Sequence, residues 1–134
     1  MSNNIEEGDK LDIDFSKLKS VATIDSKVIP VIVQDANTKD VLMMAYVNEE
    51  ALKYTIEKKI AVFWSTSRNE LWIKGKESGQ YLDLVEIRVN CEQNSLLYIV
   101  KLRNIGACHT RNNFGQFRYS CYYRKVDTNN LTFI

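Results

Sequence analysis

The sequence predicts an α+β fold, namely a small, mostly antiparallel β domain with one or two short helices. Runs of β-branched and aromatic residues recur along the chain and are separated by turn residues, which is typical of strands. One segment, from Glu49 to about Lys58, instead repeats its apolar residues at helical spacing. At 134 residues the chain is long enough for one domain with a core of its own, and two domains would be crowded.

The first elements are a predicted hairpin and a helix. Ile29–Gln34 is rich in β-branched residues, Asp35–Asp40 holds turn residues, and Val41–Val47 is apolar again, which indicates two strands joined by a long loop. Asn48 can cap a following helix because its side chain accepts a backbone N–H, and the acids after it face the positive end of the helix dipole. We therefore expect the helix over residues 49–58.

The rest of the chain is predicted to be mostly β. Pro30, the only proline, fits a strand start or edge, because it has no backbone N–H to donate. Residues 1–27 form a polar arm with one short helical turn, and residues 28–134 form the domain. In the arm, four apolar side chains look able to dock on the domain: Leu11, Ile13, Phe15 and Leu18. Later strands are expected over residues 61–65, 71–73, 82–89, 96–102 and 116–126, the last of which contains Cys121.

Composition excludes several classes of function. With 45% hydrophobic residues, 26% charged residues and a net charge of +1, the chain has no excess of positive charge for nucleic-acid binding. No apolar run approaches the ~20 residues of a membrane span. The N-terminal residues Met1–Leu11 are polar and acidic, unlike a secretory signal. We therefore expect a cytoplasmic protein, in which a thiol is more often metal-bound or catalytic than cross-linked.

Three cysteines and a single histidine are the most informative residues. Cys108 and His109 are adjacent, and Cys91 and Cys121 lie upstream and downstream of Cys108 with 16 and 12 residues intervening. Three cysteines cannot all pair within one chain. Three thiolates can bind zinc and leave its fourth position open, as in catalytic sites, although three small buried apolar residues would give the same spacing.

A loop between two predicted strands carries basic residues and glycines. Arg68, Lys74 and Lys76 supply positive charge, and Gly75 and Gly79 let backbone N–H groups approach a phosphate. The alternative is a solvated turn beside a charged edge. The tryptophans of this region, at positions 64 and 72, could stack on a purine or lie in the core.

The stretch from Val28 to Arg124 resembles the phosphoribosyl-AMP cyclohydrolase family of histidine biosynthesis, over about three quarters of the chain. The residues that carry the resemblance are Pro30–Asp35, Val41–Tyr46, Phe63–Ser65, Ser67-Arg68, Glu70–Trp72, Lys74-Gly75, Ser78-Gly79, Ala107–Thr110 and Ser120–Arg124.

This resemblance implies a zinc-dependent hydrolase that opens the N1–C6 bond of the adenine ring of phosphoribosyl-AMP. It implies a small α+β fold in a zinc-linked, intertwined homodimer, with the thiols of Cys91, Cys108 and Cys121 supplied across the subunit interface. Next to a ligand, His109 can transfer the protons, although a purely structural histidine is the alternative. The substrate and its phosphates are then held by Arg68, Trp72, Lys74, Gly75, Ser78 and Gly79.

The chain also departs from the family pattern. Family members usually carry Asp-Cys-Asp-x-Asp, whose carboxylates bind magnesium, whereas this chain has Asn90, Glu92 and Asn94 around Cys91. Magnesium prefers charged oxygen ligands, so this second metal site should be weak or absent. The segment from Cys108 to Cys121 is also longer than is usual.

Three functions fit the sequence. The first is an authentic cyclohydrolase acting on a phosphorylated nucleotide with zinc and little or no magnesium. The second is a zinc hydrolase of the same fold that acts on another ribosylated purine-like heterocycle. The third is a non-catalytic zinc-stabilised dimer. A zinc-deaminase site is not expected, because the chain has neither H-x-E nor P-C-x-x-C.

Overall fold

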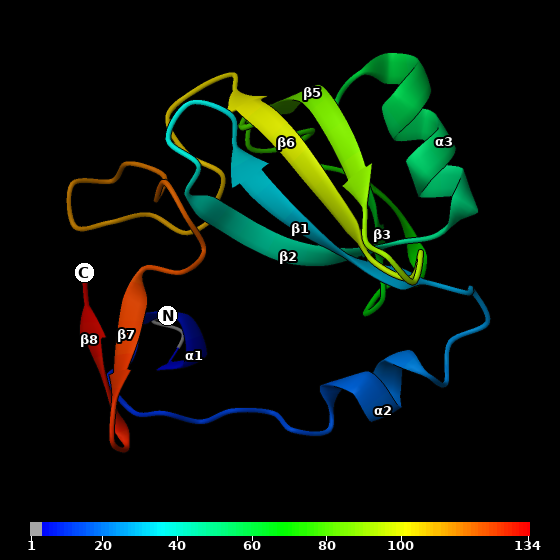
Figure 1. Cartoon of the computed structure of the whole chain (residues 1–134). Coiled ribbons are helices and arrows are strands. Elements are labelled where there is room, and N and C mark those ends of the chain that lie inside the picture. Colours follow the sequence, from blue (N-terminus) through cyan, green and yellow to red (C-terminus); the bar gives the residue numbers. More distant parts are fainter. Residues whose placement is uncertain (1–3) are drawn as a thin grey trace.

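A computed structural model describes residues 4–134 and shows one central four-stranded sheet (Figure 1). The strand order is β2-β1-β6-β5. Neighbouring strands are antiparallel except for β1 and β6, which run parallel from the pair Val31 and Leu96 onwards. The four strands are β1 (Ile29–Asp35), β2 (Val41–Val47), β5 (Leu82–Val89) and β6 (Leu96–Leu102). The predicted β1–β2 hairpin is confirmed, and Pro30 stands at a strand start, one residue before β1 pairs with β6.

Helix α3 (Glu49–Lys58) has the predicted bounds. Asn48 caps it by accepting the backbone N–H of Ala51 at 2.9 Å, and Lys59 ends it in the left-handed conformation at φ 58°. Inside the helix, the buried hydroxyl of Thr55 accepts the backbone N–H of Val62 at 3.0 Å and so ties α3 to β3 (Val62–Ser65). Strand β3 pairs with β4 (Glu70–Ile73) as an antiparallel hairpin.

The core lies where the sheet meets α3 and the β3–β4 hairpin. Its largest fully buried side chains are Tyr98 of β6 and Phe63 of β3, whose rings stack at 5.9 Å. Inward-facing residues of β1, such as Val31 and Val33, alternate with less buried neighbours, which is the period of two expected of a strand with one covered face. This packing holds β3, β4 and the loop after them against the end of the sheet.

The arm and the C-terminus differ from the sequence prediction. The arm contains two short helices, α1 (Asn4–Glu7) and α2 (Lys17–Val21), and the C-terminus forms a separate hairpin of β7 (Arg124–Asp127) and β8 (Asn130–Phe133). Figure 1 shows this hairpin beside α1 and apart from the sheet. The predicted strand over residues 116–126 is wrong, because only its end is a strand. Cys121 lies outside β7, and its N–H makes a single bond to the carbonyl of Leu42 in β2 without forming a strand there.

Backbone hydrogen bonds hold the arm to the C-terminal hairpin. The N–H of Leu131 bonds to the carbonyl of Asp9 at 2.7 Å, and the N–H of Leu11 bonds to that of Asn129 at 3.1 Å. Of the four apolar side chains expected to dock, Ile13, Phe15 and Leu18 are 54%, 91% and 68% exposed, and Leu11 is partly buried. Within residues 4–134, no helix is both long and apolar enough to cross a membrane.

Candidate active site

Two of the three cysteines lie together. Cys108 is buried, and its thiol is hydrogen-bonded to that of Cys121 and lies 3.0 Å from the Thr110 hydroxyl. The bond from Cys121, helped by Thr110, lowers the pKa of Cys108 to about 5. The same bond raises the pKa of Cys121, and burial of its thiol raises it further. The rest of the Cys121 residue is exposed. The arrangement therefore favours a thiolate at Cys108 beside a thiol at Cys121, and a metal ion that bound both sulfurs would displace the remaining proton.

Cys91 is not part of this pair within one chain. It is exposed in the turn between β5 and β6, whereas Cys108 follows the opposite end of β6. Cys121 is bonded to Leu42 of β2, which lies level with the middle of β6. β6 has seven residues and is therefore roughly 20 Å long, at about 3.3 Å per residue. In the described part of one chain, no three His, Cys, Asp or Glu side chains gather where they could hold a metal.

The loop after β4 is shaped by its glycines. Gly75 has φ +92°, and a Cβ there would lie 2.4 Å from the backbone nitrogen of Tyr81, so the turn needs glycine. Gly79 has φ +81° and donates its N–H to the carbonyl of Gly75 at 2.7 Å. The side chain of Gln80 then accepts the backbone N–H of Gly106 at 3.0 Å, which fixes the loop against the segment that leads to Cys108.

A cavity of about 670 Å³ brings the predicted substrate residues and His109 together. Trp72 lines it, whereas Trp64 donates its ring N–H to Asn69 at 3.1 Å. Gly79 shapes the loop but does not line the cavity. A larger cavity of about 790 Å³ lies between residues 112–123 and the C-terminus and contains neither His109 nor the thiols. The predicted residues that line the smaller cavity are Arg68, Trp72, Lys74, Gly75, Ser78 and His109.

Lys74 lines the same cavity although it is only 3% exposed. Burial lowers its pKa, and the nearby charges of Cys121 and Cys108 oppose that effect. Its ammonium group is therefore close to the thiol pair as well as to the cavity. Arg68, by contrast, is exposed and pairs with Glu70 at 3.6 Å, so it can turn to a ligand at little cost.

His109 is exposed and forms a hydrogen bond with a carboxylate of the N-terminal arm. Its Nε2 lies 2.7 Å from the Oε2 of Glu6 in α1. The neighbouring Glu7 accepts two bonds from the guanidinium of Arg118, at 2.7 and 2.8 Å. No signal in the sequence singled out Glu6, because it lies more than 100 residues from His109 in a polar arm.

The segment around Cys91 is held by its amides. The side-chain oxygen of Asn90 accepts the backbone N–H groups of Asn94 and Ser95 at 3.0 and 2.9 Å. The side-chain amide of Asn94 donates to Glu92 at 3.0 Å. These oxygens close the turn by hydrogen bonds, and Glu92 is the one carboxylate among the three predicted magnesium positions.

The longer segment between Cys108 and Cys121 forms a small projecting turn. Arg111 bridges to Phe117, and Asn112 accepts the backbone N–H groups of Phe114 and Gln116. Phe114 at its tip is 88% exposed. At the base of the turn, the main chain of Gly106 leaves no room for a Cβ, which would lie 2.3 Å from the carbonyl oxygen of Arg118. No pattern in the sequence singles out that glycine.

Comparison with known proteins agrees with this geometry. The sequence profile named phosphoribosyl-AMP cyclohydrolase matches residues 43–123. A protein of that name from Archaeoglobus fulgidus is 49% identical over 100 residues, which are 75% of this chain and 86% of that protein. Others from Chlorobium phaeovibrioides and Chloroherpeton thalassium are 44% and 38% identical over 90% and 94% of this chain, and 82% and 84% of their own. Because the profile spans more than half of the chain and the relatives align over most of their length, the chain belongs to the phosphoribosyl-AMP cyclohydrolase family of hydrolases.

Proposed function

We propose that this protein opens the adenine ring of phosphoribosyl-AMP by hydrolysis of the N1–C6 bond, as a step of histidine biosynthesis. The observation that carries the proposal is the cavity in which His109 stands opposite a basic glycine loop, beside the thiol pair. A nucleotide with two phosphates needs cations and backbone donors at one end and a proton-transfer group at the other. This arrangement supplies both within one space.

The chain's residues can divide the reaction between them. In the substrate, the N1 substituent leaves the ring cationic and makes C6 electrophilic. A C6–O bond forms from water, the C6–N1 bond breaks, and one proton of the water is transferred to N1. His109 lines the cavity and is able to take the proton from the water and return it to the leaving nitrogen. Arg68, Lys74 and Gly75 line the same cavity and would hold the phosphates.

The donors present fit zinc. Two adjacent thiols that share one proton are soft, anionic ligands after metal binding, and an exposed Cys91 is available to a second subunit. Zinc held by Cys108 and Cys121 of one subunit and Cys91 of its partner would act as a Lewis acid that makes water acidic near neutral pH. The homodimer follows from this proposal, because one chain does not complete the ligand set.

Magnesium fits less well. Asn90 and Asn94 offer neutral side-chain oxygens, each of which already accepts a hydrogen bond within their own turn. Only Glu92 brings a charge, and Mg²⁺ binds through carboxylates and retained water. We therefore propose that turnover depends on zinc and responds little to magnesium.

A spectroscopic assay with phosphoribosyl-AMP tests the function. The zinc-loaded protein should turn the substrate over, and His109→Ala should lower kcat by about 10²–10⁴-fold while zinc content is retained. Turnover of another ribosylated heterocycle but not of phosphoribosyl-AMP would favour a related hydrolase. Zinc-dependent dimerisation with no turnover of either substrate would favour a structural dimer.

A further inference from the structure

The N-terminal arm reaches the histidine of the candidate site with a carboxylate. Nε2 of His109 and Oε2 of Glu6 are 2.7 Å apart, which is hydrogen-bond distance. The Glu6 side chain is 32% exposed and that of His109 is 70% exposed. Among the described residues that line the substrate cavity, His109 is present and Glu6 is not, so Glu6 approaches the imidazole from outside that cavity.

The arm segment that carries Glu6 is anchored at several points. The hydroxyl of Tyr123 donates to the carbonyl of Glu6 at 2.6 Å, and the guanidinium of Arg124 donates to the carbonyls of Ile5 and Gly8 at 2.7 and 2.8 Å. Arg118 binds Glu7 through two bonds and also donates to the Thr110 hydroxyl at 3.1 Å.

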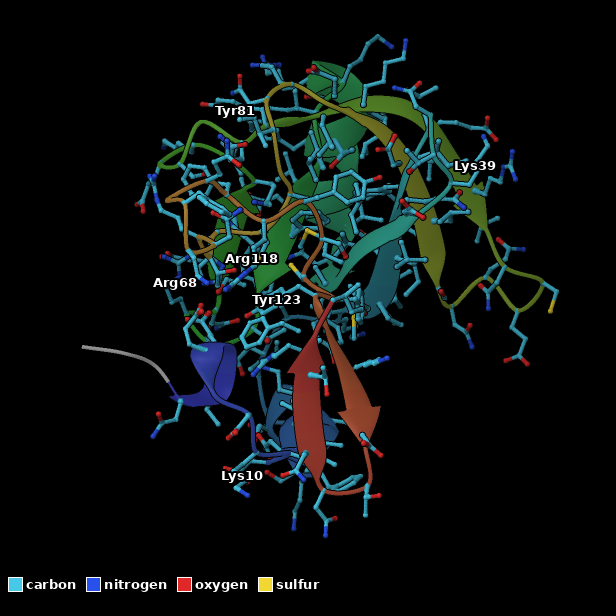
Figure 2. The ribbon with its side chains drawn as sticks, turned by 90° about the vertical axis from the view of Figure 1, so that its left-hand side faces the viewer. Lys10, Lys39, Arg68, Tyr81, Arg118 and Tyr123 are labelled. Atoms are coloured by element: carbon cyan, nitrogen blue, oxygen red, sulfur yellow. The ribbon has the colours of Figure 1, made fainter. Side chains whose placement is uncertain are left out.

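These anchors come from the segment that carries Cys121. Figure 2 shows Arg118 and Tyr123 next to each other near α1, and the Arg118 guanidinium lies 4.2 Å from the centre of the Tyr123 ring. A lone surface ion pair is weak because two long side chains must be ordered for it. Here the backbone of α1 is already fixed by three carbonyl contacts, so little further ordering is needed to hold the Glu6 carboxylate at His109.

We propose that Glu6 is a positioning residue, which orients the His109 imidazole for proton transfer. A carboxylate accepts a hydrogen bond and so selects the ring form that carries its proton on Nε2. This leaves the lone pair of Nδ1 as the proton acceptor. The ring cannot swing away from the cavity without breaking the bond to Glu6. The polar arm thus becomes part of the active site instead of a passive extension.

This inference rests on the catalytic role proposed for His109. Its consequence is confined to the chemical step, because Glu6 does not line the cavity and is not expected to contact substrate. Removal of its carboxylate should therefore lower kcat and leave KM nearly unchanged. The expected loss in Glu6→Ala is about tenfold, part of the 10²–10⁴-fold that a positioned acid or base contributes.

Four zinc-loaded full-length proteins give the kinetic test: the wild type, Glu6→Ala, Glu6→Asp and Asp9→Asn. Glu6→Asp restores a carboxylate and should recover more than half of the lost kcat. Asp9→Asn removes an equal charge from the same arm and should leave kcat unchanged, since Asp9 holds Leu131 through its backbone carbonyl. An unchanged kcat in Glu6→Ala, an equal loss in Asp9→Asn, or a loss confined to KM would overturn the proposal.

A second measurement does not depend on activity. His109 is the only histidine, so the ring nitrogens of a ¹⁵N-labelled sample report it without overlap. A slowly exchanging, downfield Nε2–H proton should be present in the wild type and Asp9→Asn and lost in Glu6→Ala. If the contact is seen and His109→Ala remains fully active, the catalytic role of His109 fails. If His109→Ala is inactive and no such proton is seen in the wild type, the positioning role of Glu6 fails alone.

Discussion

The separation of Cys91 from the other two thiols leads to a quantitative prediction about mixed dimers. If each zinc site takes Cys91 from one subunit and Cys108 with Cys121 from the other, Cys91→Ser and Cys108→Ser should each abolish zinc binding and activity. A dimer with one chain of each kind has one site with both substitutions and one site with none. The purified mixed dimer should therefore regain about half of the wild-type activity and about one zinc per dimer.

Coexpression of two differently tagged chains, followed by two affinity steps, isolates the mixed dimer. The matched control combines Cys108→Ser with Cys121→Ser. The same subunit supplies both of these residues to a site. Each of the two sites in the control dimer therefore keeps one substitution, and no activity should return. The prediction depends on the structure, because Cys91 does not gather with the other two thiols in the described part of one chain. Failure of the first mixture to recover, or equal recovery in the control, would refute the shared site.

Three further predictions concern metal, magnesium and pH. Removal of zinc by a chelator should lower Tm and dissociate the dimer, because zinc at a thousandfold excess over its Kd stabilises the native state by about 4 kcal/mol. An unchanged Tm in differential scanning fluorimetry would argue against a stabilising metal. Turnover should respond little to magnesium in the wild type and strongly in the triple variant Asn90→Asp, Glu92→Asp, Asn94→Asp, as measured by rate against magnesium concentration; strong dependence in the wild type would show that other carboxylates bind the ion. Burial raises the pKa of Asp35, but the hydrogen bonds that its carboxylate accepts, among them one from the Tyr119 hydroxyl at 2.7 Å, together leave that pKa below its usual 3.8. Its stabilisation is therefore present above pH 3.8 and lost as pH falls through the lowered pKa. Asp35→Asn should lower the free energy of unfolding by about 1–2 kcal/mol at pH 7 and by less near pH 3, as urea denaturation would measure; an equal loss at both pH values would contradict this.

Local sequence patterns were sufficient for most of the sheet and for α3. The Asn48 cap and the acids after it gave the start of the helix, since the cap needs only its own side chain and a backbone N–H three residues on. The β-branched run Ile29–Gln34 predicted β1, although not which of its side chains are buried. The parallel pairing of β1 with β6 could not be predicted in this way, because it joins segments about 65 residues apart and no turn connects them directly.

The region around Cys121 shows why local propensity can fail. Its aromatic residues favour a strand, but the N–H of Cys121 bonds to Leu42 and that of Tyr122 bonds to the Ser120 hydroxyl. These tertiary and local side-chain bonds replace a strand ladder. The same competition explains the arm, where carbonyl groups bonded to Arg124 anchor the segment while Phe15 remains exposed.

Lys74 connects the two parts of the candidate site electrostatically. A buried ammonium group is costly unless negative charge lies close to it, and the thiol pair with its single proton supplies that charge. A Lys-Gly pair in a loop suggests an exposed cation, so the sequence pattern could not reveal that Lys74 is buried beside the two cysteines. Because the same side chain lines the cavity, a phosphate and the sulfurs draw on one positive charge. The basic loop and the cysteine pair therefore meet at one side chain.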